Sequence, residues 1–204
     1  MAGHGCSCVD GQPKSPNDCP YMDPALVDPH LTELGEQQAV ANRPKAHALA
    51  LRKVYVSPLR RALKTALLGF DNHDGSQVTY KALELAREQL GLHHCDQRTT
   101  KSTLATEFPS VEWPIDMADS DGLWTEVRES KAALVERALA TLRVLAVDES
   151  PRLALVTHSS FLKAMFAVAM DFEACGTHED QNRLSQWFET GELRTLVVNF
   201  TPLL

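Results

Sequence analysis

The chain has 204 residues, and at about 150 residues per domain it is expected to form a single domain over residues 1–204. Hydrophobic residues make up 44% and charged residues 23% of the sequence, which is typical of a globular protein and excludes collagen-like, fully disordered and membrane-spanning classes. The net charge of −7 argues against nucleic acid as the main partner. A membrane partner is not expected either, because no apolar run approaches the ~20 residues that would cross a bilayer.

Five cysteines are present, and residues 1–18 have neither the basic stretch nor the apolar stretch of a secretory signal. We therefore expect free thiols and a cytoplasmic protein. A zinc site is the alternative, because Cys6, Cys8 and residues 93–95 (His-His-Cys) include suitable ligand types. Their spacing matches none of the usual zinc patterns, so we expect neither a metal nor another cofactor.

The first third of the chain predicts a loop, two helices and a strand. Residues 6–30 are rich in Pro, Gly, Asp and Asn and are expected to form a long loop. Thr32 is a suitable N-cap for a helix over residues 33–50. The β-branched and aromatic run at residues 53–56 predicts a strand, and a second helix is expected over residues 59–68.

The middle of the chain is less regular. Residues 77–80 are expected to form a short strand, followed by a helix over residues 81–90 that ends at Gly91. Residues 93–122 contain two prolines and many acidic residues and are predicted to be irregular.

The last third returns to regular structure. Residues 124–147 have the apolar spacing of an amphipathic helix, and the apolar run at residues 153–156 predicts a strand buried on both faces. A helix over residues 161–170 and a final strand over residues 193–200 are expected to complete the domain. Strands that alternate with helices indicate an α/β fold, with a mostly parallel central sheet and helices on both faces.

Several common catalytic motifs are absent from the sequence. It contains no Gly-x-Ser-x-Gly, no Walker A loop and no His-Glu-x-x-His. Their absence argues against an ordinary α/β-hydrolase, a P-loop nucleotide hydrolase and a zinc-helix metalloprotease.

Two junctions between a predicted strand and the helix after it carry side chains suited to binding anions. Residues 57–66 (SPLRRALKTA) place Arg61 at the start of a helix, where the guanidinium fork and the helix N-terminus both favour phosphate or carboxylate. Residues 155–158 (LVTH) place His158 at the carboxyl end of a strand, and histidine is the side chain most readily tuned near neutral pH. Taken singly, each has a plain alternative: a solvated arginine pair on a helix, or a hydrogen-bonded histidine at a sheet edge.

Together, these two junctions resemble those of the phosphoglycerate mutase-like histidine phosphatase superfamily. Residues 31–39 (LTELGEQQA) are similar to a helix start of this family, and residues 192–195 (ELRT) resemble the usual entry to its last strand. Residues 87–98 resemble a segment of its phosphatase-like branch. The resemblance runs in the family's order from about Tyr21 to the C-terminus, and it implies the same α/β fold.

The resemblance also implies four catalytic residues. His4, in Gly-His-Gly, matches the family nucleophile, and Arg61 matches the arginine that grips the phosphate. Glu88 matches the acid that protonates the leaving oxygen, although a plain exposed acid on a helix is the alternative for this residue. His158 matches the second active-site histidine.

Three further residues are expected to bind substrate. Asp10 stands six residues after His4, where many members have an asparagine, and Arg98 is expected to add a phosphate or carboxylate contact. Ser159 follows His158 where a glycine is common, which is expected to narrow the pocket. No metal is required in this chemistry, because arginine and histidine supply the positive charge.

The N-terminal motif departs from the family pattern. Gly3 stands where the family has an arginine, and three residues precede His4, whereas a strand needs about five. Two interpretations follow: an incomplete gene product, or a sheet without its usual first strand. His4 is accordingly either the nucleophile or a chance match.

These residues favour a metal-independent phosphomonoesterase that forms a phosphohistidine and acts on a small phosphorylated substrate. A phosphatase is preferred to a mutase, because mutases of the family usually carry additional segments that close over the substrate. The second hypothesis is a degraded member that binds a phosphorylated or carboxylated ligand. The third is a recruited lyase or isomerase that uses Arg61, Glu88 and His158 without a phosphoenzyme.

Overall fold

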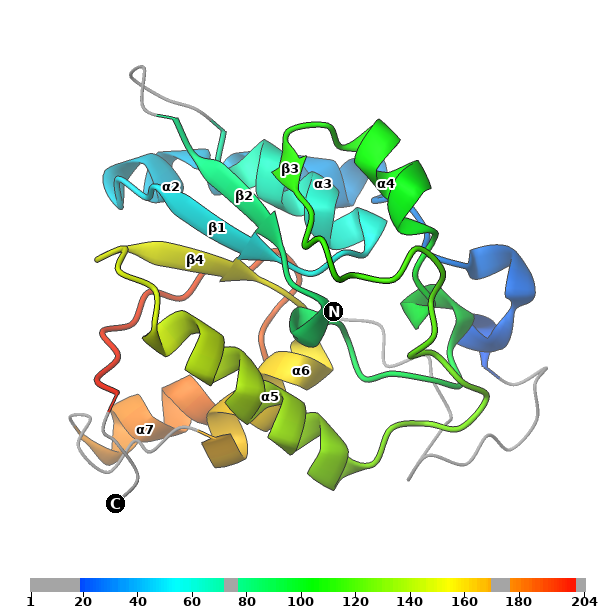
Figure 1. Ribbon diagram of the computed structural model, residues 1–204. Helices are drawn as coiled ribbons and strands as arrows, with labels where there is room; N and C mark the ends of the chain where they lie inside the picture. The colour runs from blue at the N-terminus through cyan, green and yellow to red at the C-terminus, as the bar shows by residue number, and fades with distance from the viewer. Residues whose placement is uncertain (1–18, 72–76, 170–176, 201–204) are drawn as a thin grey trace.

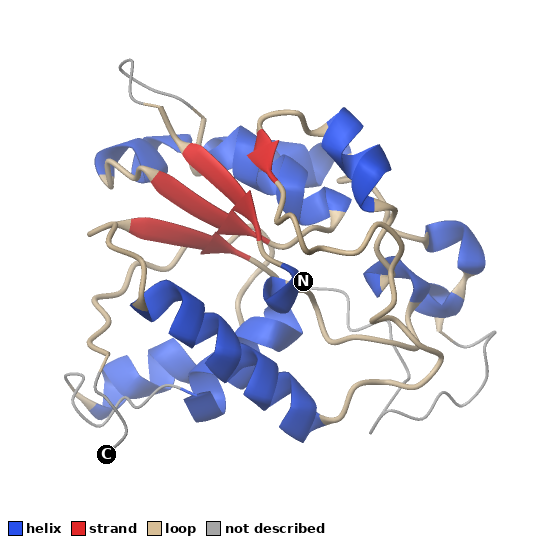
Figure 2. Ribbon diagram, viewed as in Figure 1, coloured by secondary structure: helices blue, strands red, loops and turns tan. Residues whose placement is uncertain are grey.

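The computed structural model describes residues 19–71, 77–169 and 177–200. Within these ranges the strands form one sheet of four parallel strands, in the order β3-β2-β1-β4 (Figures 1 and 2). The strands are β1 (Lys53–Val56), β2 (Thr79–Ala82), β3 (Val111–Glu112) and β4 (Leu153–Val156). The expected α/β fold with a mostly parallel sheet is confirmed.

Helices lie on both sides of this sheet (Figure 1). On one side α3 packs against β1 and β4, and α1 packs against α3. On the other side α5, α6 and α7 form a group below β4 in the view of Figure 1. The helices are α1 (Glu33–Ala41), α2 (Arg43–Ala48), α3 (Arg60–Gly69), α4 (Lys101–Glu107), α5 (Lys131–Ala146), α6 (Ser159–Ala164) and α7 (His178–Ser185).

The strands divide their side chains between two apolar cores. Val54 and Val56 of β1 and Val156 of β4 are buried in the core that includes α3. Leu155 packs instead against the core of α5 and α6, where Phe161 is fully buried. Successive side chains of a strand point to opposite faces, so each helical layer is held by alternate residues of the same strands.

Two helix starts have the capping chemistry that favours them. The Thr32 hydroxyl accepts from Gly35 N at 3.1 Å, as expected, and the Ser130 hydroxyl accepts from Ala133 N at 3.2 Å at the start of α5. The single helix predicted over residues 33–50 is divided into α1 and α2. Pro44 lies in the first turn of α2, where it has no N–H to continue the hydrogen bonds of α1.

The helix predicted over residues 81–90 is wrong. β2 extends two residues beyond the predicted strand, a short 3-10 turn follows at Glu84–Ala86, and the chain then runs irregularly. Parallel pairing with β1 outweighs the local helix propensity at the start of this segment, because it buries Ala82 in the core. Gly91 ends no helix: its φ of +76° and its close approach to the Val127 carbonyl, 2.0 Å from where a Cβ would lie, require a glycine in this loop.

The strand predicted over residues 193–200 is also wrong. This segment is the red trace that leads to the C-terminus in Figure 1, and in the described part of the chain it pairs with no strand. Leu193 and Leu196 pack against the two cores instead. An apolar run resembles a strand in sequence. An extended segment becomes part of a sheet, however, only where a neighbouring strand exchanges backbone hydrogen bonds with it.

Three other boundaries differ from the predictions. Residues 93–122 were expected to be irregular but contain α4 and β3. The helix expected over residues 124–147 begins only at Lys131. The helix expected over residues 161–170 is divided between α6 and a π-helical turn at Met165–Ala169.

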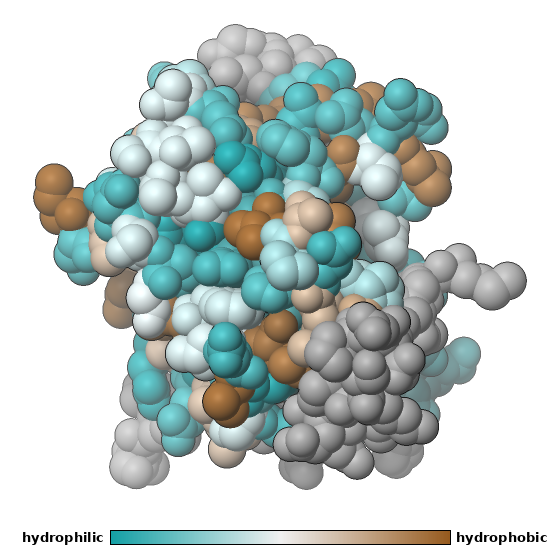
Figure 3. All heavy atoms as spheres, turned by 90° about the vertical axis from the view of Figure 1, so that its right-hand side faces the viewer, coloured by the Kyte–Doolittle hydropathy of each residue, from teal (hydrophilic) through white to brown (hydrophobic). Residues whose placement is uncertain are grey.

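Hydrophilic residues dominate the coloured part of the face shown in Figure 3. No helix in the described ranges is long and apolar enough to cross a bilayer. The expected absence of a first strand before His4 falls on residues 1–18, which lie outside the described residues.

Candidate active site

Three of the sequence-predicted site residues meet at one edge of the sheet. Arg61 lies in the first turn of α3, directly after β1, while Glu88 follows β2 and His158 follows β4. Because these strands are parallel, their carboxyl ends share one edge, which is where open α/β sheets bind ligands. Arg61, Glu88 and His158 all line the same cavity of about 1930 Å³. A small-ligand site occupies roughly 300–1,000 Å³, so a ligand bound at this cluster would fill only part of the cavity.

His158 is fixed by the strand beside it. It is the N-cap residue of α6, and its Nε2 lies 2.8 Å from the hydroxyl of Ser57, which is fully buried. Ser57 in turn donates its backbone N–H to Val156 O at 2.9 Å, so β1 and β4 together orient the imidazole. Burial, with the nearby guanidinium of Arg61 and two further arginines, holds the pKa of His158 well below its usual range. His158 is therefore a neutral imidazole at neutral pH.

Glu88 is buried at the start of α6 rather than exposed on a helix. Its side chain accepts backbone N–H groups of Gln89 at 2.9 Å, Phe161 at 3.1 Å and Ser160 at 3.2 Å. Burial, and next the carboxylate of Asp96, raise the pKa of Glu88, although these N–H donors and Arg61 oppose the rise. A carboxyl group with a raised pKa can hold a proton to donate. Because Glu88 is buried, the plain alternative of an exposed acid on a helix is wrong.

Arg61 is held from one side by the turn at residues 94–96. Its Nη1 donates to Cys95 O at 2.6 Å, and its Nη2 donates to Asp96 Oδ1 at 2.9 Å. The side chain remains 23% exposed. With two of its five N–H groups engaged in this way, the guanidinium keeps donors for an anion in the cavity that it lines.

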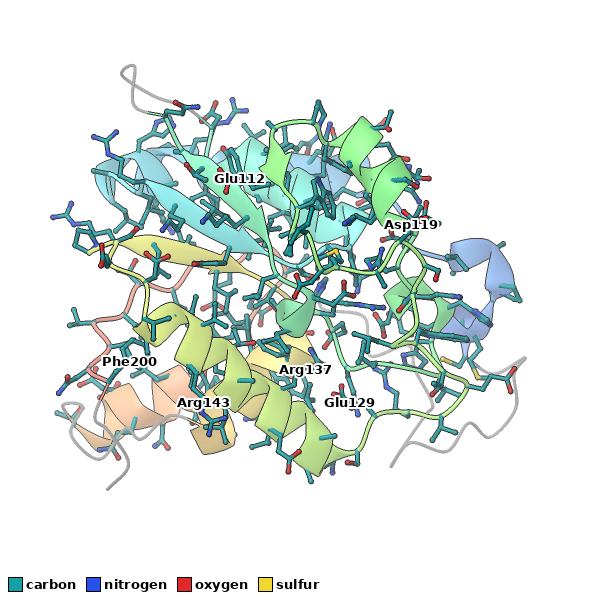
Figure 4. All side chains as sticks on the ribbon, viewed as in Figure 1. Glu112, Asp119, Glu129, Arg137, Arg143 and Phe200 are labelled. Carbon is teal, nitrogen blue, oxygen red and sulfur yellow. The ribbon has the colours of Figure 1, made fainter. Side chains whose placement is uncertain are left out.

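The backbone that carries Glu88 is secured by α5. Arg137, which Figure 4 labels on α5 beside Glu129, donates to the carbonyls of Arg87 at 2.6 Å and Glu88 at 2.9 Å. It also pairs with Glu129 at 2.6 Å. This arrangement satisfies the buried carbonyls of an irregular segment, and it fixes the direction from which Glu88 enters the cavity.

The remaining sequence-predicted residues are placed differently. Arg98 is 4% exposed and donates to the carbonyls of Thr99 and Ala118, both at 2.8 Å; it does not line the cavity. The structure therefore places Arg98 in a loop-bracing role instead of beside the expected substrate. Ser159 is exposed and does line the cavity, at the first position of α6. His4 and Asp10 lie outside the described residues.

Three further residues of the site were not singled out in the sequence: Ser57, Asp96 and Arg137. Ser57 opens the SPLRRALKTA motif and could have been found as the polar residue at the end of a buried strand. Asp96 lies two residues before Arg98, but the sequence does not indicate which of the two faces the cavity. Among the described residues, no group of three or more His, Cys, Asp or Glu side chains is arranged to hold a metal ion.

Comparison with known proteins shows the family of this chain. The profile of the family described as histidine phosphatase superfamily (branch 1) matches residues 25–185. Phosphoglycerate mutase-like protein 1 of Arabidopsis thaliana is 31% identical over 188 residues, which cover 78% of this chain and 66% of that protein. A second Arabidopsis thaliana relative, phosphoglycerate mutase-like protein, is 27% identical over 208 residues, covering 87% of this chain and 76% of the relative.

A solved structure shares the fold. The crystal structure of a putative alpha-ribazole-5'-P phosphatase from Escherichia coli superposes with a TM-score of 0.51 and 19% sequence identity. The match covers 79% of this chain and 74% of that one.

Proposed function

The chain belongs to the histidine phosphatase superfamily, and on that premise we propose that it is a phosphomonoesterase that works through a phosphohistidine and needs no metal or other cofactor. One observation carries the proposal. A guanidinium, a neutral imidazole and a carboxyl group with a raised pKa line one cavity at the carboxyl edge of the sheet. Such a set can bind a phosphoryl group and protonate a leaving oxygen.

In the first step, a ring nitrogen of His4 attacks phosphorus and the bond to the ester oxygen breaks. Arg61 binds the equatorial phosphoryl oxygens, and His158 donates a hydrogen bond to them as a neutral imidazole. Glu88 gives its proton to the departing alkoxide, which leaves as an alcohol.

In the second step, Glu88, now ionised, accepts a proton from water as that water attacks the phosphohistidine. Inorganic phosphate leaves, His4 is restored and Glu88 is protonated again. The raised pKa of Glu88 suits it to both steps, because a carboxyl group that is too acidic would seldom be protonated when the substrate arrives.

The names of the relatives support a small phosphorylated substrate, since both relatives are described as phosphoglycerate mutase-like and the structural neighbour as a putative phosphatase. We propose hydrolysis rather than mutase activity as the reaction, and the cytoplasm as its compartment. Cys95, a free thiol inside the fold, fits a reducing compartment.

The test is release of phosphate from p-nitrophenyl phosphate between pH 4 and pH 8 in the presence of EDTA, with 2- and 3-phosphoglycerate assayed for interconversion. We expect wild-type turnover, none in His4→Ala, and a loss of about 10²- to 10³-fold in His158→Ala. His47→Ala is the matched control, because His47 pairs with Asp71 and does not line the cavity. An acid-labile, base-stable phosphoenzyme is expected in wild type.

Other results would favour the other hypotheses. An inert wild type that still binds inorganic phosphate would make the chain a ligand-binding member of its family. Turnover that persists in His4→Ala would indicate chemistry without a phosphohistidine.

A further inference from the structure

Asp96 lies between two arginines that line the cavity. It ends the 3-10 turn His94–Asp96 and its side chain is 4% exposed. Asp96 Oδ1 accepts from Arg61 Nη2 at 2.9 Å, and Asp96 Oδ2 accepts from Arg128 Nη1 at 2.8 Å. One carboxylate is therefore shared by two guanidinium groups, each on a different oxygen.

Arg128 fixes this carboxylate in place. The same Nη1 also donates to Gly91 O at 2.8 Å, so Arg128 ties Asp96 to the loop that passes the site. The Arg128 side chain is 11% exposed, and Arg128, like Arg61, lines the cavity. Because both oxygens of Asp96 accept charge-assisted hydrogen bonds, its carboxylate has little freedom to move. The guanidinium fork of Arg61, which it binds, is restricted in the same way.

A second buried aspartate provides a contrast. Asp121 accepts both terminal nitrogens of Arg87, at 2.8 and 2.6 Å, and neither residue lines the cavity. The two carboxylates are equally buried, with 3% and 4% of their side chains exposed. Their partners differ: Arg87 is fully buried, whereas Arg61 keeps donors toward the cavity. Asp121 therefore serves the fold, and Asp96 is placed to serve the site.

We propose that Asp96 is a positioning residue, which holds the Arg61 fork toward the bound phosphoryl group and keeps a negative charge beside the proton donor Glu88. The inference rests on the proposed function, because it names how that same site is oriented. Neither part requires Asp96 to touch the substrate.

The second part of the proposal follows from the charges around Glu88. The cavity is lined by Glu88 together with Asp96 of the 3-10 turn, Arg61 of α3 and His158 at the end of β4, while Arg137 of α5 binds the backbone carbonyl of Glu88. Of these groups Asp96 supplies negative charge, and it raises the pKa of Glu88. Its removal is therefore expected to lower that pKa, so that Glu88 loses its proton at a lower pH.

The experiment compares Asp96→Asn with Asp121→Asn as the matched control. Three quantities are measured for each: the melting temperature, the affinity for inorganic phosphate by calorimetry, and the pH profile of kcat/KM with p-nitrophenyl phosphate. For Asp96→Asn we expect about 10- to 100-fold weaker phosphate binding and kcat/KM, with the basic limb of the profile at lower pH. For Asp121→Asn we expect a lower melting temperature, with phosphate affinity within about 2-fold of wild type once the folded fraction is accounted for.

Equal losses of phosphate affinity in the two folded variants, or an unmoved basic limb in Asp96→Asn, would overturn the proposal. If Asp96→Asn does not fold, Arg128→Gln keeps the carboxylate but removes what fixes it. We then expect weaker phosphate binding without a shift of the basic limb to lower pH, and unchanged phosphate binding would refute the inference. A wild type that binds phosphate without turnover contradicts the proposed function alone, since the phosphate titrations still test the role of Asp96.

Discussion

At the amino end of β1, Lys53 Nζ and Tyr55 Oη both donate to Asp148 Oδ2 at 2.7 Å, forming a small closed cluster. At the carboxyl end of the same sheet, Arg61 donates to Asp96 and to Cys95 O, and the residue lines a cavity. Both ends contain a buried aspartate that binds a cation. Lys53 does not line the cavity, whereas Arg61 lines it together with Glu88 and His158.

The ionisable groups at the two ends of the sheet also differ in their pKa values. Burial alone would raise the pKa of Asp148, but hydrogen bonds from Lys53 and Tyr55 hold it below its usual range, and burial and Asp148 raise the pKa of Tyr55 to about 12. At the carboxyl end the pKa of Glu88 is raised and that of His158 is lowered, so both groups favour their uncharged forms. The amino end stabilises charges in pairs, whereas the carboxyl end keeps Glu88 able to hold a proton and His158 as a neutral imidazole.

The largest effect in this comparison of the two ends is the loss of activity expected when Arg61 is replaced. Arg61→Ala should lower kcat/KM for p-nitrophenyl phosphate by about 10²- to 10³-fold or more, because it removes a preorganised donor from the phosphoryl site. Arg60→Ala is the control: its guanidinium pairs with Glu107 at 2.6 Å, and Arg60 does not line the cavity. A comparable loss of activity in Arg60→Ala would show that activity depends on the general packing of α3 and not on the Arg61 guanidinium in particular.

The next effect concerns acid stability at the carboxyl end. Burial, and next Arg128, lower the pKa of His93 to about 4, against about 6.5 in the unfolded chain. The folded protein therefore binds fewer protons between these values, so stability is fully present above pH 6.5 and falls by up to about 3 kcal/mol as the pH drops to 4. Urea unfolding of His93→Gln across this range should show a shallower fall than wild type. Parallel curves for the two proteins would refute it.

The smallest effect is expected at the amino end. Asp148→Asn removes the charge from a carboxylate whose side chain is 4% exposed, so the free energy of unfolding should fall by about 2 kcal/mol. Asp148 also lines the cavity, but its cluster lies at the other end of the sheet from Arg61, so kcat/KM should stay within about 2-fold of wild type. Urea unfolding and the p-nitrophenyl phosphate assay measure the two quantities on the same sample, and a large loss of activity without a loss of stability would contradict the comparison.

The sequence predicts the parts of this molecule that depend on residues close to one another in the sequence. The strand at residues 53–56, the cap at Thr32 and the polar residues Arg61 and His158 at strand ends follow from local patterns, and the structure places them accordingly. The catalytic roles of Arg61 and His158 stay predictions.

The parts that depend on distant partners could not be read in this way. Residues 81–90 have the composition of a helix, but residues 81–82 extend β2 instead, because β1 offers hydrogen bonds and a core. The positioning role proposed for Asp96 depends on the fold, which brings Arg61 and Arg128 to its two oxygens. Arg98, its near neighbour in the sequence, is the more conspicuous cation, but it is bound by loop carbonyls and by the carboxylate of Glu84.

The direct pairing of β1 with β4 has a consequence for how the protein folds. The two strands are among the most widely separated in the chain, yet Ser57 and His158 bond across their ends. Closing so long a loop costs entropy before any contact repays it, so we expect this pairing to form late in folding. Until it forms, no partly folded species has an assembled anion site, and phosphate added during refolding should bind only chains that have completed the sheet.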